Sequence, residues 1–251
     1  MNRSELKREA KAHIFTPRRP HPIGVTALHL IFMSALMMLI MELSDIGRFQ
    51  AELAARLLEA SEHMRQANTM ATIHLPEMSI TALGVFFFIV PWMFRWVLDL
   101  GYLYYVRGIV KGEALGFRSL FEGFNYVRKA IILRLIQVIL VFGGLVLFVA
   151  PGIWTITAFS QANLLLLDHP KRGVIWCLRE SERLMRGHKW EYFVLFLSFL
   201  GWLLLTITPL PFLNTAALLW YTPYTTFTYI GYYNRLTGQN SPDCETERSD
   251  M

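Results

Sequence analysis

The residues of this chain best suited to chemistry are two opposite charges within a long apolar segment, Arg95 and Asp99. Their spacing of four residues places them on one face of a helix, where an arginine and an aspartate can pair. A charge at the centre of a bilayer costs about 2.5–3.5 kcal/mol on insertion scales, so it usually has a partner and faces protein or water. We therefore expect Asp99 to neutralise Arg95. The pair either fixes helix packing or forms a ligand-binding site for an anionic lipid, a substrate or a proton.

Three other polar side chains lie in apolar segments. Arg134 falls near the expected cytoplasmic start of a helix, from which its long side chain could reach the membrane interface. Gln161 and Asn163 could hydrogen-bond to neighbouring helices. The pair Gly143-Gly144 favours close helix packing rather than chemistry.

The motifs of common catalytic and metal sites do not occur in the sequence. The histidines are scattered, and neither HExxH nor CxxC is present, whereas a metal site needs clustered His, Cys or carboxylate ligands. No phosphate-binding or dinucleotide-binding glycine loop and no GxSxG elbow occurs. Cys177 and Cys244 are too few for a disulfide framework, so we expect free thiols. The sequence therefore predicts no enzyme activity, no catalytic residues, no cofactor and no metal.

Membrane-spanning helices must position these residues. Of the 251 residues, 54% are hydrophobic and only 17% are charged, whereas a soluble domain carries about 25% charged residues. The apolar residues form long runs, and a bilayer span needs roughly 20 of them. We predict an all-α membrane bundle between two tails, 1–22 and 235–251, with a helical loop at 44–77 on the outer side. The six expected spans are 23–43, 79–105, 130–149, 152–168, 190–208 and 212–233.

Proline residues define the boundaries in the second half. The third and fourth spans form one apolar run that is too long for a single crossing, and Pro151-Gly152 near its middle is a turn signal. We expect a helical hairpin that turns at this pair on the outer side. The fourth span is short, so a re-entrant helix is the alternative. Pro209 and Pro211 similarly divide the fifth and sixth spans.

The distribution of basic residues predicts the orientation. Nineteen of the 24 Lys and Arg residues lie in the two tails and in two connections, whereas the opposite side has only Arg48, Arg56 and Arg65. Because cytoplasmic loops are enriched in Lys and Arg, both termini are expected in the cytoplasm. This arrangement also explains the net charge of +5 without a nucleic-acid partner.

Two connections have helical apolar stripes, at 117–131 and 173–186. Such helices either pack under the bundle or lie at the headgroup boundary as docking or gating elements. Each precedes a hairpin, so 117–168 and 173–234 resemble two copies of one unit. The loop helix near 46–67 is expected at the surface, with partner binding as the alternative. The predicted membrane-interface residues are Arg179, Arg183, Arg186, Gly187, His188, Lys189 and Trp190.

Several motifs resemble those of a bacterial family of integral membrane proteins, catalogued as domain of unknown function 975. They are Ser119-Leu-Phe-Glu-Gly-Phe124, Ala150-Pro-Gly-Ile153 and Ser181-Glu-Arg-Leu-Met-Arg-Gly-His-Lys-Trp190. The resemblance covers almost the whole chain and implies a protein of the bacterial cytoplasmic membrane. It implies no activity and no catalytic residues.

Three functions are therefore compared. A non-catalytic scaffold or accessory subunit would engage membrane lipid or another membrane protein, and this is the first expectation. The alternative is a small transporter or lipid-handling protein, and an intramembrane enzyme is the third. A cavity that reaches Arg95 and Asp99 favours transport, a fully packed bundle favours the scaffold, and a nucleophile beside a base favours the enzyme.

Overall fold

The computed structural model describes residues 3–15, 21–43, 45–67, 81–113, 115–206 and 211–238. Within these ranges every regular element is a helix, which confirms the all-α prediction. The chain divides into two compact units, one comprising Met1–Leu30 and Trp96–Met251 and the other Ile31–Arg95.

The smaller unit contains the amphipathic helix α3 (Asp45–Ala67). The helix covers the stripe expected near 46–67, while residues 44 and 68–80 lie outside the described ranges, and the outer placement of this loop remains a prediction. Glu52 and Arg56 are one turn apart and pair at 2.6 Å. Leu57 and Leu58 are exposed. Partner binding by this helix remains a prediction.

Three helices of the described residues are long and apolar enough to cross a membrane, namely Pro22–Leu43, Leu83–Val110 and Phe117–Leu147. The first is α2 (Pro22–Leu43), and the second lies in α4 (Ala82–Val110). The third joins the 3₁₀ helix η1 (Phe117–Tyr126) to α5 (Val127–Leu147). Because helices rise 1.5 Å per residue, each exceeds the roughly 30 Å of hydrocarbon core.

The fourth and fifth expected spans are not continuous helices, which corrects the prediction of six unbroken ones. The fourth is α6 (Val149–Ala158) followed by α7 (Ala162–Asp168), and the fifth is α9 (Lys189–Leu197) followed by α10 (Leu200–Thr206). The sixth, α11 (Pro211–Leu236), is 26 residues long, but it is rich in threonine and tyrosine. Hydropathy alone could not reveal the two breaks, because apolar side chains continue across both.

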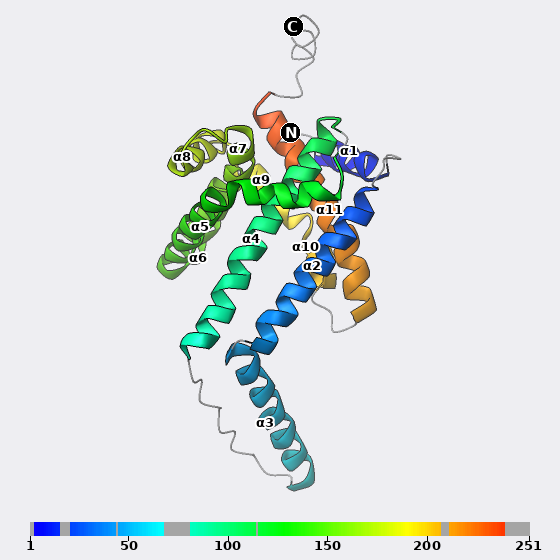
Figure 1. Cartoon of the computed structure of the whole chain (residues 1–251), viewed down its shortest axis with the longest axis vertical. Helices are drawn as coiled ribbons and strands as arrows, with labels where there is room; N and C mark the ends of the chain where they lie inside the picture. Colours follow the sequence, from blue (N-terminus) through cyan, green and yellow to red (C-terminus); the bar gives the residue numbers. More distant parts are fainter. Residues whose placement is uncertain are drawn as a thin grey trace, which may run out of the picture. The chain divides into compact units, whose positions relative to one another are not determined.

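The hairpin expected in the third and fourth spans is confirmed, but its turn is not at Pro151-Gly152. Helix α5 ends before Phe148, whose extended backbone (φ −166°, ψ 157°) makes the turn, and α6 continues through the proline. Proline is tolerated in the first turn of a helix because its missing N–H would have no partner there. A Cβ on Gly144 would lie 3.1 Å from the Gly152 Cα. These two glycines therefore let α5 and α6 lie side by side (Figure 1).

The stripe expected at 117–131 is divided between two rows of η1. Residues three apart eclipse in a 3₁₀ helix, so Leu120 and Gly123 are buried together, whereas Phe121 and Phe124 form an exposed row. A Cβ on Gly123 would lie 2.3 Å from the Val97 carbonyl oxygen of α4. The backbone of η1 therefore packs directly on the backbone of α4.

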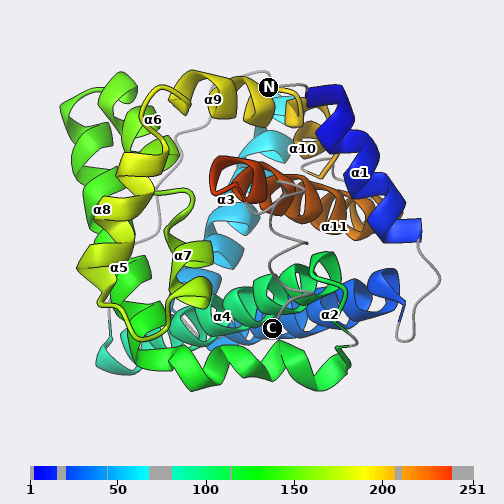
Figure 2. The same ribbon diagram turned by 90° about the horizontal axis from the view of Figure 1, so that it is seen from above.

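Helix α1 (Arg3–Phe15) packs along α11, although the sequence predicted only a tail at 1–22 (Figure 2). One face of α1, formed by Leu6, Ala10 and Ile14, is fully buried. On α11, Arg235 pairs with Glu5 at 3.3 Å and with Glu9 at 2.8 Å. The described part of the N-terminal segment is therefore an integral layer of the larger unit.

Candidate ligand-binding site

A cavity of ≈ 260 Å³ lies in the larger unit, among α4, α5, α7, α9, α11 and the first part of α2. We call it the polar cavity, because charged, amide and hydroxyl groups line much of it. Its charged and amide lining residues are His29, Asp99, Arg134, Gln161 and Asn163. Its aromatic lining residues are Trp96, Tyr102, Tyr192 and Tyr229.

A second hollow of ≈ 600 Å³ adjoins the polar cavity between α5 and α6. We call it the apolar groove, and its own lining is Gln137, Val138, Val141, Phe142, Leu145, Ile156 and Phe159. Five residues line both hollows, so the two are contiguous: Arg134, Ser160, Asn163, Tyr192 and Tyr229. A polar chamber that opens into an apolar groove suits an amphipathic molecule, because ligand sites combine apolar walls with a few placed polar groups.

Asp99 is held beside His29 in the polar cavity, with 3.5 Å between Oδ1 and the histidine Nε2. The His29 ring stacks on Tyr102 at 4.5 Å, and the Tyr102 hydroxyl lies 2.9 Å from the hydroxyl of Thr26. This chain of contacts fixes the imidazole. Arg95 belongs to the smaller unit, where its guanidinium lies 5.8 Å from the centre of the Trp92 ring. Pairing of Arg95 with Asp99 remains a prediction.

The break between α6 and α7 carries Gln161 into the polar cavity. Ser181 of α8 (Val174–Leu184) donates a hydrogen bond to the Ala158 carbonyl oxygen at 2.8 Å and accepts one from the Gln161 N–H at 3.2 Å. Both backbone groups would otherwise be unsatisfied at the break. Gln161 therefore bonds to another helix through its backbone, whereas its side chain, which was expected to make such a contact, donates to the adjacent Ser160 at 2.9 Å. The sequence analysis placed Ser181 in the apolar stripe of 173–186 and missed this role.

Each hollow is lined by a glutamine whose buried amide oxygen has no hydrogen-bond partner among the described residues. In the polar cavity the amide is Gln161, which is 1% exposed and donates only to Ser160. In the apolar groove it is Gln137, which donates to the Phe159 carbonyl oxygen at 3.0 Å. A buried acceptor left unsatisfied costs about 1–3 kcal/mol. A ligand with N–H or O–H donors would recover that energy.

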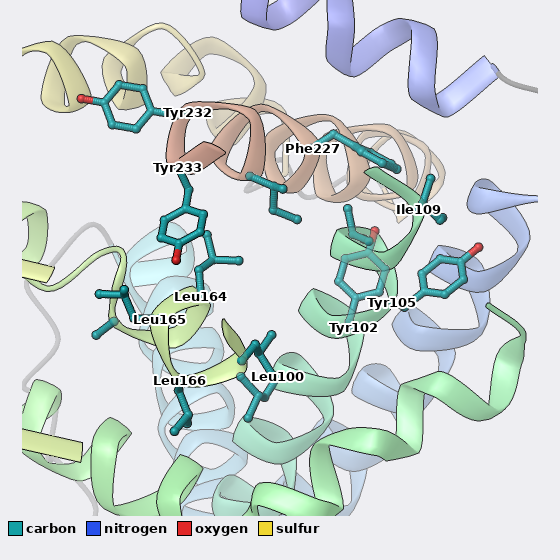
Figure 3. Packing of buried hydrophobic residues seen from close by; sticks show 14 of the residues in the cluster. Leu100, Tyr102, Tyr105, Ile109, Leu164, Leu165, Leu166, Phe227, Tyr232 and Tyr233 are labelled. Atoms are coloured by element: carbon teal, nitrogen blue, oxygen red, sulfur yellow. The ribbon is translucent and has the colours of Figure 1, made fainter. Parts of the chain in front are cut away.

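A buried ion cluster around Asp168 was missed by the sequence analysis. The Asp168 carboxylate at the end of α7 pairs with Arg107 of α4, lies 3.6 Å from Lys111, and accepts a hydrogen bond from Tyr233 of α11. Tyr233 points toward Leu164 and Leu165, whereas Tyr232 points the other way (Figure 3). The signal available was that Asp168 is the first charge after the uncharged run 135–167. The cluster links α4, α7 and α11, and the Asp168 side chain is buried within it.

The residues predicted for the membrane interface line neither hollow. Arg179 and Arg183 are exposed on α8, Arg186 is exposed just after it, and Glu180 pairs with Arg183 at 2.6 Å. The apolar face of α8 packs on α5 and α7, so this face is covered by other helices of the larger unit. Contact of the three arginines with headgroups remains a prediction.

The turn after α8 contains Gly187, whose φ of +81° is the left-handed conformation that glycine adopts at little cost. His188 follows it and lies 3.3 Å from Glu191. Lys189 is buried with its ammonium 4.1 Å from the centre of the Trp154 ring, and Trp190 is 73% exposed. An exposed Trp beside a buried Lys suits an interface anchor.

No group of three or more His, Cys, Asp or Glu side chains within the described ranges could hold a metal ion. No curated protein and no solved structure matched the chain. The family model described as "Protein of unknown function (DUF975)" matches residues 1–240. The match agrees with the motifs at 119–124, 150–153 and 181–190, and this chain therefore belongs to the DUF975 family.

Proposed function

We propose that this chain is a multi-pass protein of the bacterial cytoplasmic membrane that binds an amphipathic molecule and acts in lipid handling or transport, without catalysis. The observation that carries the proposal is the polar cavity around Asp99 and Arg134, which opens into the apolar groove. A cavity that reaches Arg95 and Asp99 is the feature expected of a transporter, and a packed bundle that of a scaffold. The polar cavity reaches Asp99, whereas Arg95 is not among its lining residues. The lipid-handling alternative is therefore preferred to the scaffold.

The proposed topology has six crossings with both termini in the cytoplasm. The fourth and fifth crossings are the broken pairs α6–α7 and α9–α10. Non-helical backbone within a membrane is tolerated where it lines a cavity, and transporters bind their substrates at such breaks. The break between α6 and α7 supports this topology because Ser160 and Gln161 line the polar cavity. The excess of basic residues on one side supports the orientation.

Bound amphiphile can be measured after purification of the full chain from its native membrane in a mild detergent. Lipid extraction and mass spectrometry then give the molar ratio of retained amphiphile to protein. Val141→Trp should reduce this ratio several-fold, because Val141 lines the apolar groove. Val146→Trp is the matched control, since Val146 lies on the same helix but is 70% exposed and lines neither hollow. Equal ratios in both variants and the wild type would contradict the proposal.

A scaffold role is the second candidate, and one observation favours it. Phe121 and Phe124 form an exposed aromatic pair on η1, with ring centres 6.2 Å apart. Aromatic residues are enriched where proteins meet. Replacing both with Ser should release a membrane partner and leave the retained amphiphile unchanged. Val141→Trp should instead reduce the retained amphiphile and leave the partner bound.

A further inference from the structure

We infer that the ligand is an aminophospholipid, a lipid whose phosphate carries a primary ammonium group. Its acyl chains lie in the apolar groove, its phosphate at Arg134, and its ammonium between Asp99 and Gln161. The inference rests on the proposed function and specifies the chemical class of the ligand.

The chemical groups along the two hollows occur in a fixed order. Apart from Gln137, the groove's own walls are apolar; Arg134 lines both hollows, and Asp99 and Gln161 line only the polar cavity. From the groove inward a ligand therefore meets mainly apolar walls, then a cation, then a carboxylate with an amide oxygen. An aminophospholipid has the complementary order of acyl chains, anionic phosphate and ammonium. A lipid with a phosphate but no cation would place no opposite charge at Asp99.

A second feature is the buried amide of Gln161. Its oxygen has no partner among the described residues, and the side chain is 1% exposed. Only an N–H or O–H group can satisfy this acceptor. A primary ammonium has three such donors, so it can serve both Gln161 and Asp99. A choline headgroup has none, and it would leave the oxygen unsatisfied.

A third feature is the arginine at the expected position of the phosphate. A guanidinium recognises phosphate through two parallel N–H donors, which makes arginine well suited to this group. Arg134 projects from α5 at the junction of the two hollows, where the phosphate of a lipid with chains in the groove would lie. Asn163 lines the same junction and its amide can donate to a remaining phosphate oxygen.

The test uses the full-length protein, stripped of native lipid and titrated in detergent. The three probes are phosphatidylethanolamine, phosphatidylcholine and phosphatidylglycerol with identical chains, and native mass spectrometry gives each Kd. We expect phosphatidylethanolamine to bind about ten-fold more tightly than phosphatidylcholine, the value of one hydrogen bond to a buried group. It should also bind more tightly than phosphatidylglycerol, which places no positive charge at Asp99. Glycerophosphoethanolamine, which lacks chains, should not compete.

Gln161→Met should abolish the preference for ethanolamine over choline, because the amide oxygen that accepts from the ammonium is gone. Asn234→Leu is the matched control, because Asn234 is also buried with an unpartnered amide oxygen but lines neither hollow. Arg134→Gln should weaken the binding of all three lipids by about ten-fold. If a variant does not fold, the relative affinities of the wild-type protein for the three lipids still test the assignment of an ammonium site.

The possible results separate the two proposals. Equal affinity for all three lipids, lost in Arg134→Gln, would support lipid handling and overturn the assignment of an ammonium site. Tighter binding of phosphatidylcholine would overturn it in favour of a cation held by the rings of Tyr192 and Tyr229. Competition by glycerophosphoethanolamine would assign a water-soluble ligand instead of a lipid. No measurable binding of any probe would contradict both proposals.

Discussion

Replacing Ser181 with alanine should destabilise the larger unit and disturb the ligand site together. Ser181 is fully buried, and its hydroxyl group bonds the Ala158 carbonyl oxygen at 2.8 Å and the Gln161 N–H at 3.2 Å. The substitution leaves both backbone groups unpaired in the break between α6 and α7. Each unsatisfied buried group costs about 1–3 kcal/mol, and the higher helix propensity of alanine returns roughly 0.5 kcal/mol.

The expected net loss is about 3 kcal/mol, within the range given by two unsatisfied groups. For a domain of this size that loss corresponds to a decrease in Tm of roughly 6–12 °C. Thermal unfolding in detergent, followed by circular dichroism, measures the decrease. The matched control is Ser198→Ala, because Ser198 is exposed and its hydroxyl bonds only the Leu195 carbonyl oxygen of its own helix, at 2.5 Å. The control should lose less than about 0.5 kcal/mol.

The same variant tests how the site is positioned. Without Ser181, the Gln161 backbone is no longer held at the break, so the preference for an ethanolamine headgroup should decrease along with stability. A loss of stability in Ser181→Ala no larger than in Ser198→Ala would refute the reasoning. It would show that the backbone groups at the break find hydrogen-bond partners without the hydroxyl group from α8. A large loss of stability with unchanged headgroup preference would refute only the role in positioning Gln161.

Three other predictions concern a glycine contact, a buried thiol and the membrane topology. Gly101→Ala should lower the free energy of unfolding by more than about 3 kcal/mol, because overpacking costs about 1–3 kcal/mol even where the neighbouring side chains can move. Here the new Cβ would lie 1.8 Å from a backbone oxygen of η1. Thermal unfolding should show no comparable loss in Gly143→Ala, where a new Cβ would have no atom within 4 Å. Burial raises the pKa of the Cys177 thiol, so less of it is thiolate at pH 7, and it should react with a maleimide far more slowly in the native protein than in denaturant and faster as pH rises. Equal rates in the two states would contradict its burial. Reporter fusions after Gly238 and within 54–67 should report opposite sides of the membrane, and the same side for both would contradict the six-crossing topology.

Much of the local structure could be predicted from the sequence, because it depends on short-range rules. The turn at Gly187 follows from the freedom of glycine to adopt a positive φ. The pairing of Glu180 with Arg183 follows from helical spacing. The hairpin of α5 and α6 follows from an apolar run too long for one crossing. Its turn was misplaced because proline signals both a turn and the first turn of a helix.

The packing of η1 could not be predicted in the same way. The stripe at 117–131 was assigned with helical spacing of 3.6 residues, but the segment Phe117–Tyr126 is a 3₁₀ helix with three residues per turn. Gly123 is the reason for the contact, since any side chain there would clash with the Val97 carbonyl oxygen of α4. The sequence contains this glycine, but its contact is with a residue 26 positions earlier in the chain.

The sequence alone determined that this chain is helical, that it has apolar runs long enough for a membrane, and that it belongs to the DUF975 family. These properties depend on hydropathy, charge and motifs, which are additive along the chain. Only the tertiary structure decided that Asp99, Arg134 and Gln161 line one cavity. Asp99 lies on α4, Arg134 on α5 and Gln161 in the break between α6 and α7. Their proximity depends on the close packing of these helices and on the hydrogen bonds of Ser181 at the break. Linear spacing carries no information about such contacts, because each is fixed by the mutual packing of distant segments.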